Sequence, residues 1–299
     1  MSSIAYVTDE KMLEYHRLCR NRDILFWRLS SRKKFTDFRK GDLLFFFARP
    51  AHSRRKGLIG YAHFDSVKRL SLRQMWNKFN TSTGYDSMQL LSEAIAKAAK
   101  GSIPKQMSCL LLRDVVFFVS PIFPEEVGIE IPMNLESYCY LDRNNPRLTV
   151  DILNLAQERG IDLWSAAENA DPERVFARDG IRHKFAVIHR EIGKEGGSEK
   201  ERSICSRLAK EKVEEEGWEM IRGSASECLK VTDTAVHIAL PYAVQANDRD
   251  IRIRELFGRM TMYRLLAEKY QAGKPIQFEL LGEKIPERIR EMTEQLNHA

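Results

Sequence analysis

Between residues 20 and 120, apolar and polar positions alternate in short runs separated by turn residues. This is the pattern of β-strands that each bury one face. The strands it predicts are Asp23–Arg28, Leu43–Arg49, Leu58–Phe64 and Cys109–Val119. Helical spacing of apolar residues predicts helices over Glu10–Arg20, Ser71–Phe79, Ser87–Lys100 and Thr149–Arg159, the last ended by Gly160. Short strands joined by turns favour a small β-barrel with helices.

The pattern becomes more mixed after residues 160–180. Apolar runs there predict strands at Phe185–Arg190, Trp218–Arg222, Cys228–Val231, Ala235–Val244 and Gln277–Leu281. Longer segments with helical periodicity predict helices at Glu199–Glu216, Asp250–Tyr270 and Pro286–Leu296. The sequence therefore predicts an α+β protein with two domains, a barrel over residues 1–165 and a mixed α/β domain over residues 175–299.

The predicted helix Asp250–Tyr270 carries apolar residues around much of its circumference. Such a helix is covered on two sides, either because it is buried in the domain core or because it forms a dimer interface. A homodimer is therefore one expectation for this chain.

Charge is distributed unevenly along the chain. From Arg20 to Lys78, 16 Lys and Arg stand against 4 Asp, a net charge of +12, whereas the whole chain carries +6 and the remainder therefore −6. A basic face on a mildly acidic protein most often binds a polyanion, and a solvated surface is the alternative.

Five cysteines are scattered singly, and the first ten residues lack the charged and then apolar pattern of a signal peptide. Dispersed thiols of this kind are typical of a reducing cytoplasm. No apolar run approaches the roughly 20 residues that span a bilayer. We therefore expect a cytoplasmic protein without a membrane partner.

Several motifs of the first half occur in an order and spacing that resemble the PUA-like or EVE-type modules of bacterial restriction and defence proteins. They are FWRLSS (26–31), KGDLLFFF (40–47), IGYAHF (59–64), Met75-Trp76 with Phe79, Gly84-Tyr85, Cys109 and Phe117-Phe118. The resemblance covers about a third of the chain. It implies a PUA-like barrel that binds nucleic acid, DNA in preference to RNA, with one base, often modified, turned into an aromatic pocket.

The resemblance also implies residues for this interface. Trp27 is expected in the pocket wall beside Ser30 and Ser31, with Tyr61, Phe64 and Trp76 as further aromatic candidates; core packing is the alternative for each. Phosphate contacts are expected from the neighbouring cations Arg28, Arg32, Lys33, Lys34, Arg54, Arg55 and Lys56. Such contacts position a strand without reading its sequence.

The order helix, three strands, long helix, strand in the second domain resembles the core of restriction-endonuclease-like folds. That resemblance implies Mg²⁺ held by carboxylates, with Asp233 as a candidate first acid and Glu201 as a candidate helix acid. The family's acid-x-Lys pair is missing from Val236–Pro241, where the sequence reads VHIALP. Whether the domain is an enzyme therefore stays open, and Mg²⁺ is expected only if it is a nuclease.

Other catalytic signatures are absent from the sequence, including HExxH, GxxxxGK and GxSxG. His183 and His189 are six positions apart, a spacing that fits no standard metal motif, so no metal site is predicted. Three hypotheses remain: a reader of modified DNA in a restriction or phage-defence system with a partner nuclease, an Mg²⁺-dependent nuclease with an atypical site, and an RNA-binding regulatory protein.

Overall fold

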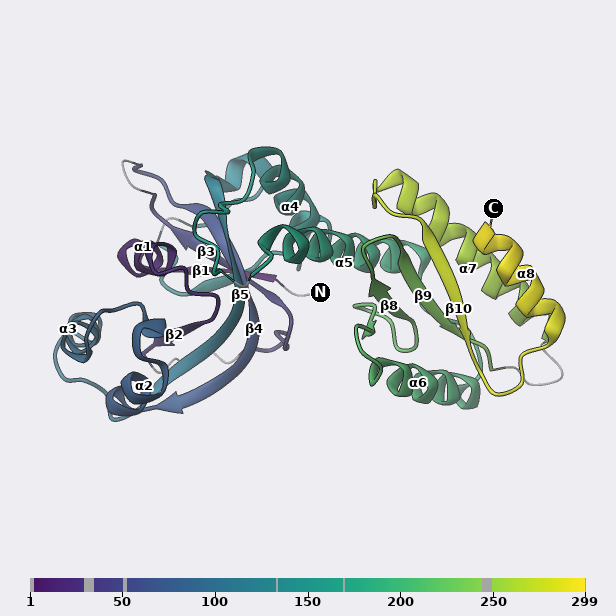
Figure 1. The fold of residues 1–299 in the computed structure, drawn as a ribbon, viewed down its shortest axis with the longest axis horizontal. Coiled ribbons are helices and arrows are strands. Elements are labelled where there is room, and N and C mark those ends of the chain that lie inside the picture. The colour runs from purple at the N-terminus through teal and green to yellow at the C-terminus, as the bar shows by residue number, and fades with distance from the viewer. Residues whose placement is uncertain are drawn as a thin grey trace. The chain divides into compact units, whose positions relative to one another are not determined.

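The computed structural model describes residues 3–29, 35–50, 53–132, 134–168, 170–243 and 249–298. The chain divides into two compact units, residues 2–177 and residues 178–299, called here the first and the second unit. The division falls within one long helix, α5 (Pro172–Ile192) (Figure 1). Each unit has its own sheet, and the α+β class predicted from the sequence is confirmed.

The first unit is built on a six-stranded sheet in the order β2-β5-β4-β3-β1-β6. Its strands are β1 (Ser3–Val7), β2 (Ile24–Arg28), β3 (Leu43–Ala48), β4 (Gly57–Leu70), β5 (Met107–Ile122) and β6 (Tyr138–Tyr140). Its helices are α1 (Glu10–Leu18), α2 (Leu72–Phe79), α3 (Met88–Ala98) and α4 (Leu148–Arg159), with short 3-10 helices at Asn80–Thr83 and Pro124–Val127. β1 pairs parallel with β3, and every other pairing in this sheet is antiparallel.

The sheet of the first unit is strongly curved. Three strands lie between β2 and β1 in the sheet, yet the rings of Phe26 in β2 and Tyr6 in β1 are only 4.8 Å apart. One hydrophobic cluster draws on all six strands, which is the filled interior that the alternation of side chains in a curled sheet produces. The expected small barrel is therefore present as a curved, filled sheet.

Two helix layers cover the opposite face of this sheet. α4 packs on β3, β4 and β5 through Leu148, Ile152 and Ala156. α2 and α3 pack on β2 and β5 through Met75, Leu91 and Ile95. α2 begins with a capping box between Ser71 and Gln74, and Gly160, at φ 89°, ends α4 as the sequence predicts. Both faces of the sheet are thus buried.

The second unit has a four-stranded sheet in the order β10-β9-β8-β7. Its strands are β7 (Glu219–Met220), β8 (Cys228–Val231), β9 (Val236–Pro241) and β10 (Ile276–Leu281). Its helices are α5, α6 (Glu199–Val213), α7 (Arg249–Lys269) and α8 (Glu287–His298). β7, β8 and β9 form an antiparallel meander, and β10 returns parallel to β9 after α7. The predicted order of helix, three strands, long helix and strand is therefore confirmed.

One predicted strand is wrong. Phe185–Arg190 lies in α5, where Phe185 and Ile188 are buried against α7 and the sheet. A short apolar run without long-range context fits a buried helix as well as a strand. α5, α7 and α8 share the main core of the unit, while α6 packs with Trp218 and Cys228 on the other face of the sheet.

Candidate functional site

Arg28, at the end of β2, lies among aromatic side chains of the first unit. Its guanidinium carbon is 4.7 Å from the centroid of the Phe35 ring, which lies 4.9 Å from the ring of Tyr138. The Tyr138 ring is 5.8 Å from that of Tyr140, and Arg143 stacks over Tyr140 at 4.0 Å. We call these five residues the arginine–aromatic cluster. The cluster places two guanidinium groups over aromatic rings. Guanidinium groups bind phosphates, and aromatic rings stack with bases.

The polar atoms of Arg28 are only partly used. Its Nε donates a hydrogen bond of 3.3 Å to Ser108 Oγ, and its Nη1 is buried with no hydrogen-bond partner among the described residues. Arg143 donates to Thr36 Oγ1 at 3.1 Å, and the Thr36 N–H donates to Tyr140 Oη at 3.1 Å. The cluster is thus tied to the segment after residue 34, and among the described residues Arg28 keeps one donor without an acceptor.

A further cation, Arg69, lies beside the cluster. Across β2, β5 and β4 the register places Arg28, Ser108 and Arg69 side by side, and paired residues share one face of a sheet. Arg69 is exposed, and so are Arg73 and Lys78 of α2, which packs on the other face of the sheet. None of these three cations has an ion pair in the part of the chain that the structure describes. These charges are available to a ligand.

The predicted aromatic candidates lie deeper than expected. Trp27 points to the other face of β2 and packs, partly buried, with Trp76 on the α2–α3 cluster; Trp27 Nε1 is buried with no partner among the described residues. Tyr61 has no exposed area and packs against Phe45, 5.6 Å between rings. Tyr61, and Phe64 in the barrel interior, are therefore core residues and cannot contact a base in this structure.

The predicted phosphate contacts differ in their surroundings. Arg54 is exposed and has no ion pair among the described residues, whereas Arg55 is ion-paired with Glu125 and stacks on Phe123 at 4.4 Å. Lys56 donates to the Leu135 carbonyl at 3.4 Å. Ser30, Ser31, Arg32, Lys33 and Lys34 lie outside the described residues, and their roles stay predictions.

The second unit contains a pocket of about 90 Å³ at one end of its sheet. Four glutamates and three arginines line it, together with the Cys205 thiol: Glu195, Glu201, Glu227, Glu255, Arg202, Arg252 and Arg259. They come from the segment before α6, from α6 and α7, and from the residue that precedes β8. Acidic and basic groups thus meet in one partly enclosed space.

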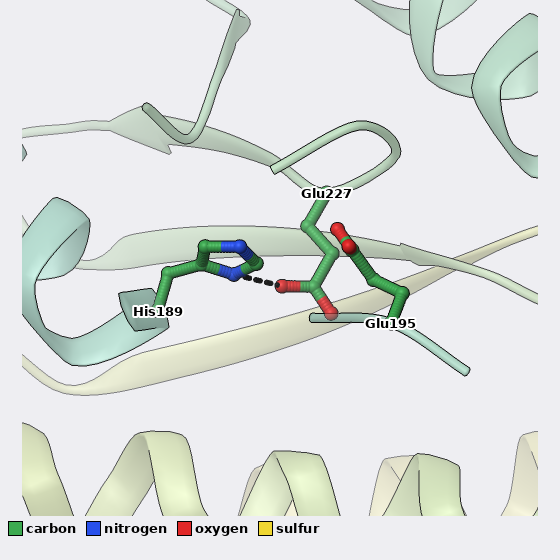
Figure 2. Close-up of side chains that lie close together, drawn as sticks. All are labelled: His189, Glu195 and Glu227. Atoms are coloured by element: carbon green, nitrogen blue, oxygen red, sulfur yellow. Dashed lines mark hydrogen bonds and ion pairs between the residues drawn. The ribbon is translucent and has the colours of Figure 1, made fainter. Parts of the chain in front are cut away.

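A buried network centred on Glu227 forms the floor of this pocket. The Glu227 carboxylate accepts hydrogen bonds from Arg259 Nε at 2.6 Å and Tyr263 Oη at 2.5 Å, and it lies 3.0 Å from His189 Nδ1. Figure 2 shows the imidazole directed at Glu227, with Glu195 beside it. Glu195 accepts from Ser224 Oγ and from the Ala225 N–H. The network joins α5, β8 and α7.

The network keeps Glu227 ionised although it is buried. Burial alone would raise its pKa, but hydrogen bonds from His189 and Arg259 outweigh that effect and hold the pKa below its ordinary value. Burial together with the Glu227 charge raises the pKa of Tyr263 well above the ordinary phenol value. Burial raises the pKa of the Cys205 thiol to about 11, and Glu201 adds to the shift, so this thiol is protonated at neutral pH.

His189, Glu195 and Glu227 have potential ligand atoms within 4.8 Å of one another. Mg²⁺ prefers six oxygen ligands in octahedral geometry. One of these three donors is an imidazole nitrogen, and the guanidinium of Arg259, bonded to Glu227, lies 3.4 Å from that nitrogen. The donor set therefore does not fit Mg²⁺.

The two predicted catalytic acids do not come together. Asp233 is exposed in the turn that follows β8, whereas the pocket lies at the other end of β8, beside Glu227. Glu201 does line the pocket, but its carboxylate accepts from the Ser198 N–H at 2.8 Å and forms the capping box of α6. Asp233 and Glu201 therefore do not lie in one site in this structure.

Sequence reasoning missed the central members of both sites. Glu227, Arg259 and Tyr263 carry no local motif, because the contacts of Glu227 join positions 32 to 38 residues apart. Phe35 and Arg143 are likewise more than 100 residues apart. The one available signal was compositional: an arginine flanked by aromatic residues in FWR.

No protein-family model and no curated protein matches this sequence. Among solved structures, the chain is similar to ASCH from Zymomonas mobilis at 13% identity and a TM-score of 0.36, over 51% of this chain and 94% of that one. A mutant form of the same protein gives 13% identity and a TM-score of 0.36, over 52% and 99%. At this identity and TM-score the function has to be inferred from the chain's own residues. None of the described helices combines the length and apolar character needed to cross a membrane.

Proposed function

We propose that this protein binds nucleic acid through its first unit, which acts as a PUA-like module. The observation that carries the proposal is Arg28: a guanidinium stacked on Phe35, with a buried Nη1 that has no partner among the described residues. An unsatisfied buried donor costs about 1–3 kcal/mol, and a phosphate or base acceptor would remove that cost. Arg143 places a second guanidinium over an aromatic ring, that of Tyr140, and donates a hydrogen bond to Thr36, 107 positions earlier in the chain.

The finer proposal concerns the ligand. The guanidinium planes of Arg28 and Arg143, which lie over the rings of Phe35 and Tyr140, are suited to stacking with an unpaired base. Stacking of a base on an aromatic ring contributes about 1–3 kcal/mol. Together with the resemblance to EVE-type modules, this favours DNA with a displaced and modified base, as read in restriction or phage-defence systems. An RNA-binding regulatory role uses the same surface and is the alternative outcome.

We assign no hydrolysis of nucleic acid to the second unit. In its pocket Glu227 and Glu255 are ion-paired with arginines, and the donor set of His189, Glu195 and Glu227 does not fit Mg²⁺. Cleavage, where it accompanies binding, is therefore assigned to a partner nuclease.

Fluorescence anisotropy with labelled single-stranded DNA, duplex DNA and RNA tests the proposal, each with and without a modified cytosine or adenine and over a salt series. Arg28→Gln removes the stacked cation, and we expect it to weaken binding about tenfold or more, because a hydrogen bond to a charged group contributes about 1.5–3 kcal/mol. Arg207→Gln is the matched control, since it removes one exposed arginine from the second unit.

The salt dependence separates the possible outcomes. Binding that falls with salt, weakens in Arg28→Gln and is unchanged in Arg207→Gln supports the proposal. Equal losses of affinity in the two variants would mean that binding depends only on the net charge of the protein. Binding that ignores salt and both substitutions would overturn it. Preference among the labelled strands then decides between DNA and RNA and identifies the base.

A further inference from the structure

The outer face of α7 carries an exposed apolar stripe. Ile251, Met262 and Leu265 are exposed by 56%, 40% and 57%. At 100° per residue, positions 251, 258, 262 and 265 fall on one side of a helix. The opposite side, with Leu256, Met260 and Tyr263, is buried in the core of the second unit. The exposed stripe is therefore separate from the face of α7 that packs in the core of the second unit.

Gly258 lies in the middle of this stripe. A β-carbon added there would meet nothing within 4 Å, so the described structure does not require glycine at this position. Glycine in a helix interior is less stable than alanine. A second helix that approaches closely at this point would account for the residue, since glycine lets two helix axes come together.

We propose that α7 pairs antiparallel with α7 of a second copy of this chain, across a two-fold axis near Thr261. In that register Leu265 of one copy covers Gly258 of the other, and the two Met262 side chains meet near the axis. An isologous contact of this kind closes as a dimer and leaves no edge for further growth.

The charges beside the stripe are complementary in the same register. Arg254 and Glu268 are both exposed, and Arg254 bonds only to the Asp250 carbonyl among the described residues. Positions 254 and 268 are equidistant from residue 261, so each Arg254 lies opposite Glu268 of the other copy, twice in the dimer.

α7 also carries Arg252 and Arg259, which line the pocket of the second unit. The inference does not depend on nucleic-acid binding, because the stripe lies in the second unit and the arginine–aromatic cluster in the first.

Sedimentation velocity of the full chain, from about 1 to about 100 µM, tests the pairing over the range expected for a modest interface. The wild-type chain is expected to change from monomer to dimer over this range. Leu265→Glu should leave it monomeric. Arg254→Glu and Glu268→Arg should each raise the dissociation constant about tenfold, and the double variant should recover it, because the double change restores opposite charges.

Gly258→Ala separates a loss of dimerisation from a folding defect, because the substitution is expected to stabilise the helix. With an unpartnered face the substitution raises the melting temperature and changes nothing else. With the proposed contact it weakens dimerisation although the helix itself is more stable. Leu18→Glu, at a leucine 65% exposed in the first unit, is the control for surface charge. A chain that stays monomeric throughout the range, or dimers unaffected by Leu265→Glu, would overturn the proposal.

Discussion

In the first unit, cations such as Arg54, Arg69 and Arg73 lie at the surface without ion pairs among the described residues, whereas in the second unit buried carboxylates are matched by arginines. The difference separates two uses of charge. An exposed, unpaired cation is available to a polyanion. A buried ion pair such as Glu227–Arg259 connects the two segments that carry it. Its charges neutralise each other and therefore attract a charged ligand only weakly.

Removing one member of the buried network should have the largest effect. Glu227→Gln removes the negative charge and one of the two oxygens that accept from Arg259 and Tyr263. Because the Arg259 charge then stays buried without its counter-ion, we expect a loss of about 3–5 kcal/mol in the free energy of unfolding of the second unit. Hydrogen exchange measured by mass spectrometry would locate the loss in β8 and α7. Glu283→Gln, at a carboxylate 78% exposed and paired with Arg207, is the control and should cost less than about 0.5 kcal/mol. A small effect of Glu227→Gln would mean that the network is not a structural anchor.

Trp27 allows the same comparison to be sharpened within the first unit. Its side chain packs with Trp76 on the α2–α3 cluster, on the face of β2 opposite Arg28. Trp27→Ala should therefore destabilise the first unit by about 2–3 kcal/mol, less than for a fully buried tryptophan, and leave the affinity of the folded protein for nucleic acid almost unchanged. Denaturant unfolding and anisotropy measured on the same sample would check this. A folded variant that has lost binding would return Trp27 to the pocket wall.

Local patterns were sufficient for most elements of both units. Ser198 with Glu201 three positions later predicts the start of α6, and the apolar run at Leu43 predicts β3, because caps and pleats depend on neighbours in sequence. α5 was not predicted at Phe185, because this part of the helix is buried on several sides. Its sequence therefore lacks the alternation of apolar and polar positions that marks a helix with one exposed face. The arginine–aromatic cluster was found only at Arg28. Its other members come together through the curvature of the sheet, and a short stretch of sequence carries no information about that curvature.

Acidification should destabilise both units through buried histidines. Burial lowers the pKa of His16 in the first unit to about 4 and that of His183 in the second to about 3. An unfolded histidine has a pKa of about 6.5, so below that pH the unfolded chain takes up a proton that the folded unit refuses. Stability is therefore full above pH 6.5 and falls as the pH decreases towards the folded values, by up to about 1.4 kcal/mol per pH unit for each histidine.

Urea unfolding at a series of pH values measures this slope. His16→Asn and His183→Asn should each flatten the dependence between pH 6 and the folded pKa, and His298→Asn, at an exposed position, should not. Three of the four tryptophans lie in the first unit, so fluorescence follows mainly its unfolding. A slope that survives both buried substitutions would assign the acid sensitivity to carboxylates.

The smallest expected effect compares two neighbouring arginines of the first unit. Arg54 has no ion pair among the described residues, whereas Arg55 is held by Glu125 and by the ring of Phe123. If Arg54 contacts a phosphate, Arg54→Gln should reduce the slope of log affinity against log salt by about 0.9 for duplex DNA. Arg55→Gln removes the same charge but also leaves Glu125 without its ion-pair partner. The salt slope of this variant should therefore change less than that of Arg54→Gln. Its affinity should fall slightly, because the Glu125 carboxylate then repels the phosphates. Equal slopes for the two variants would mean that an existing ion pair does not withhold a cation from the ligand, and the contrast drawn between the units would then apply only to buried pairs.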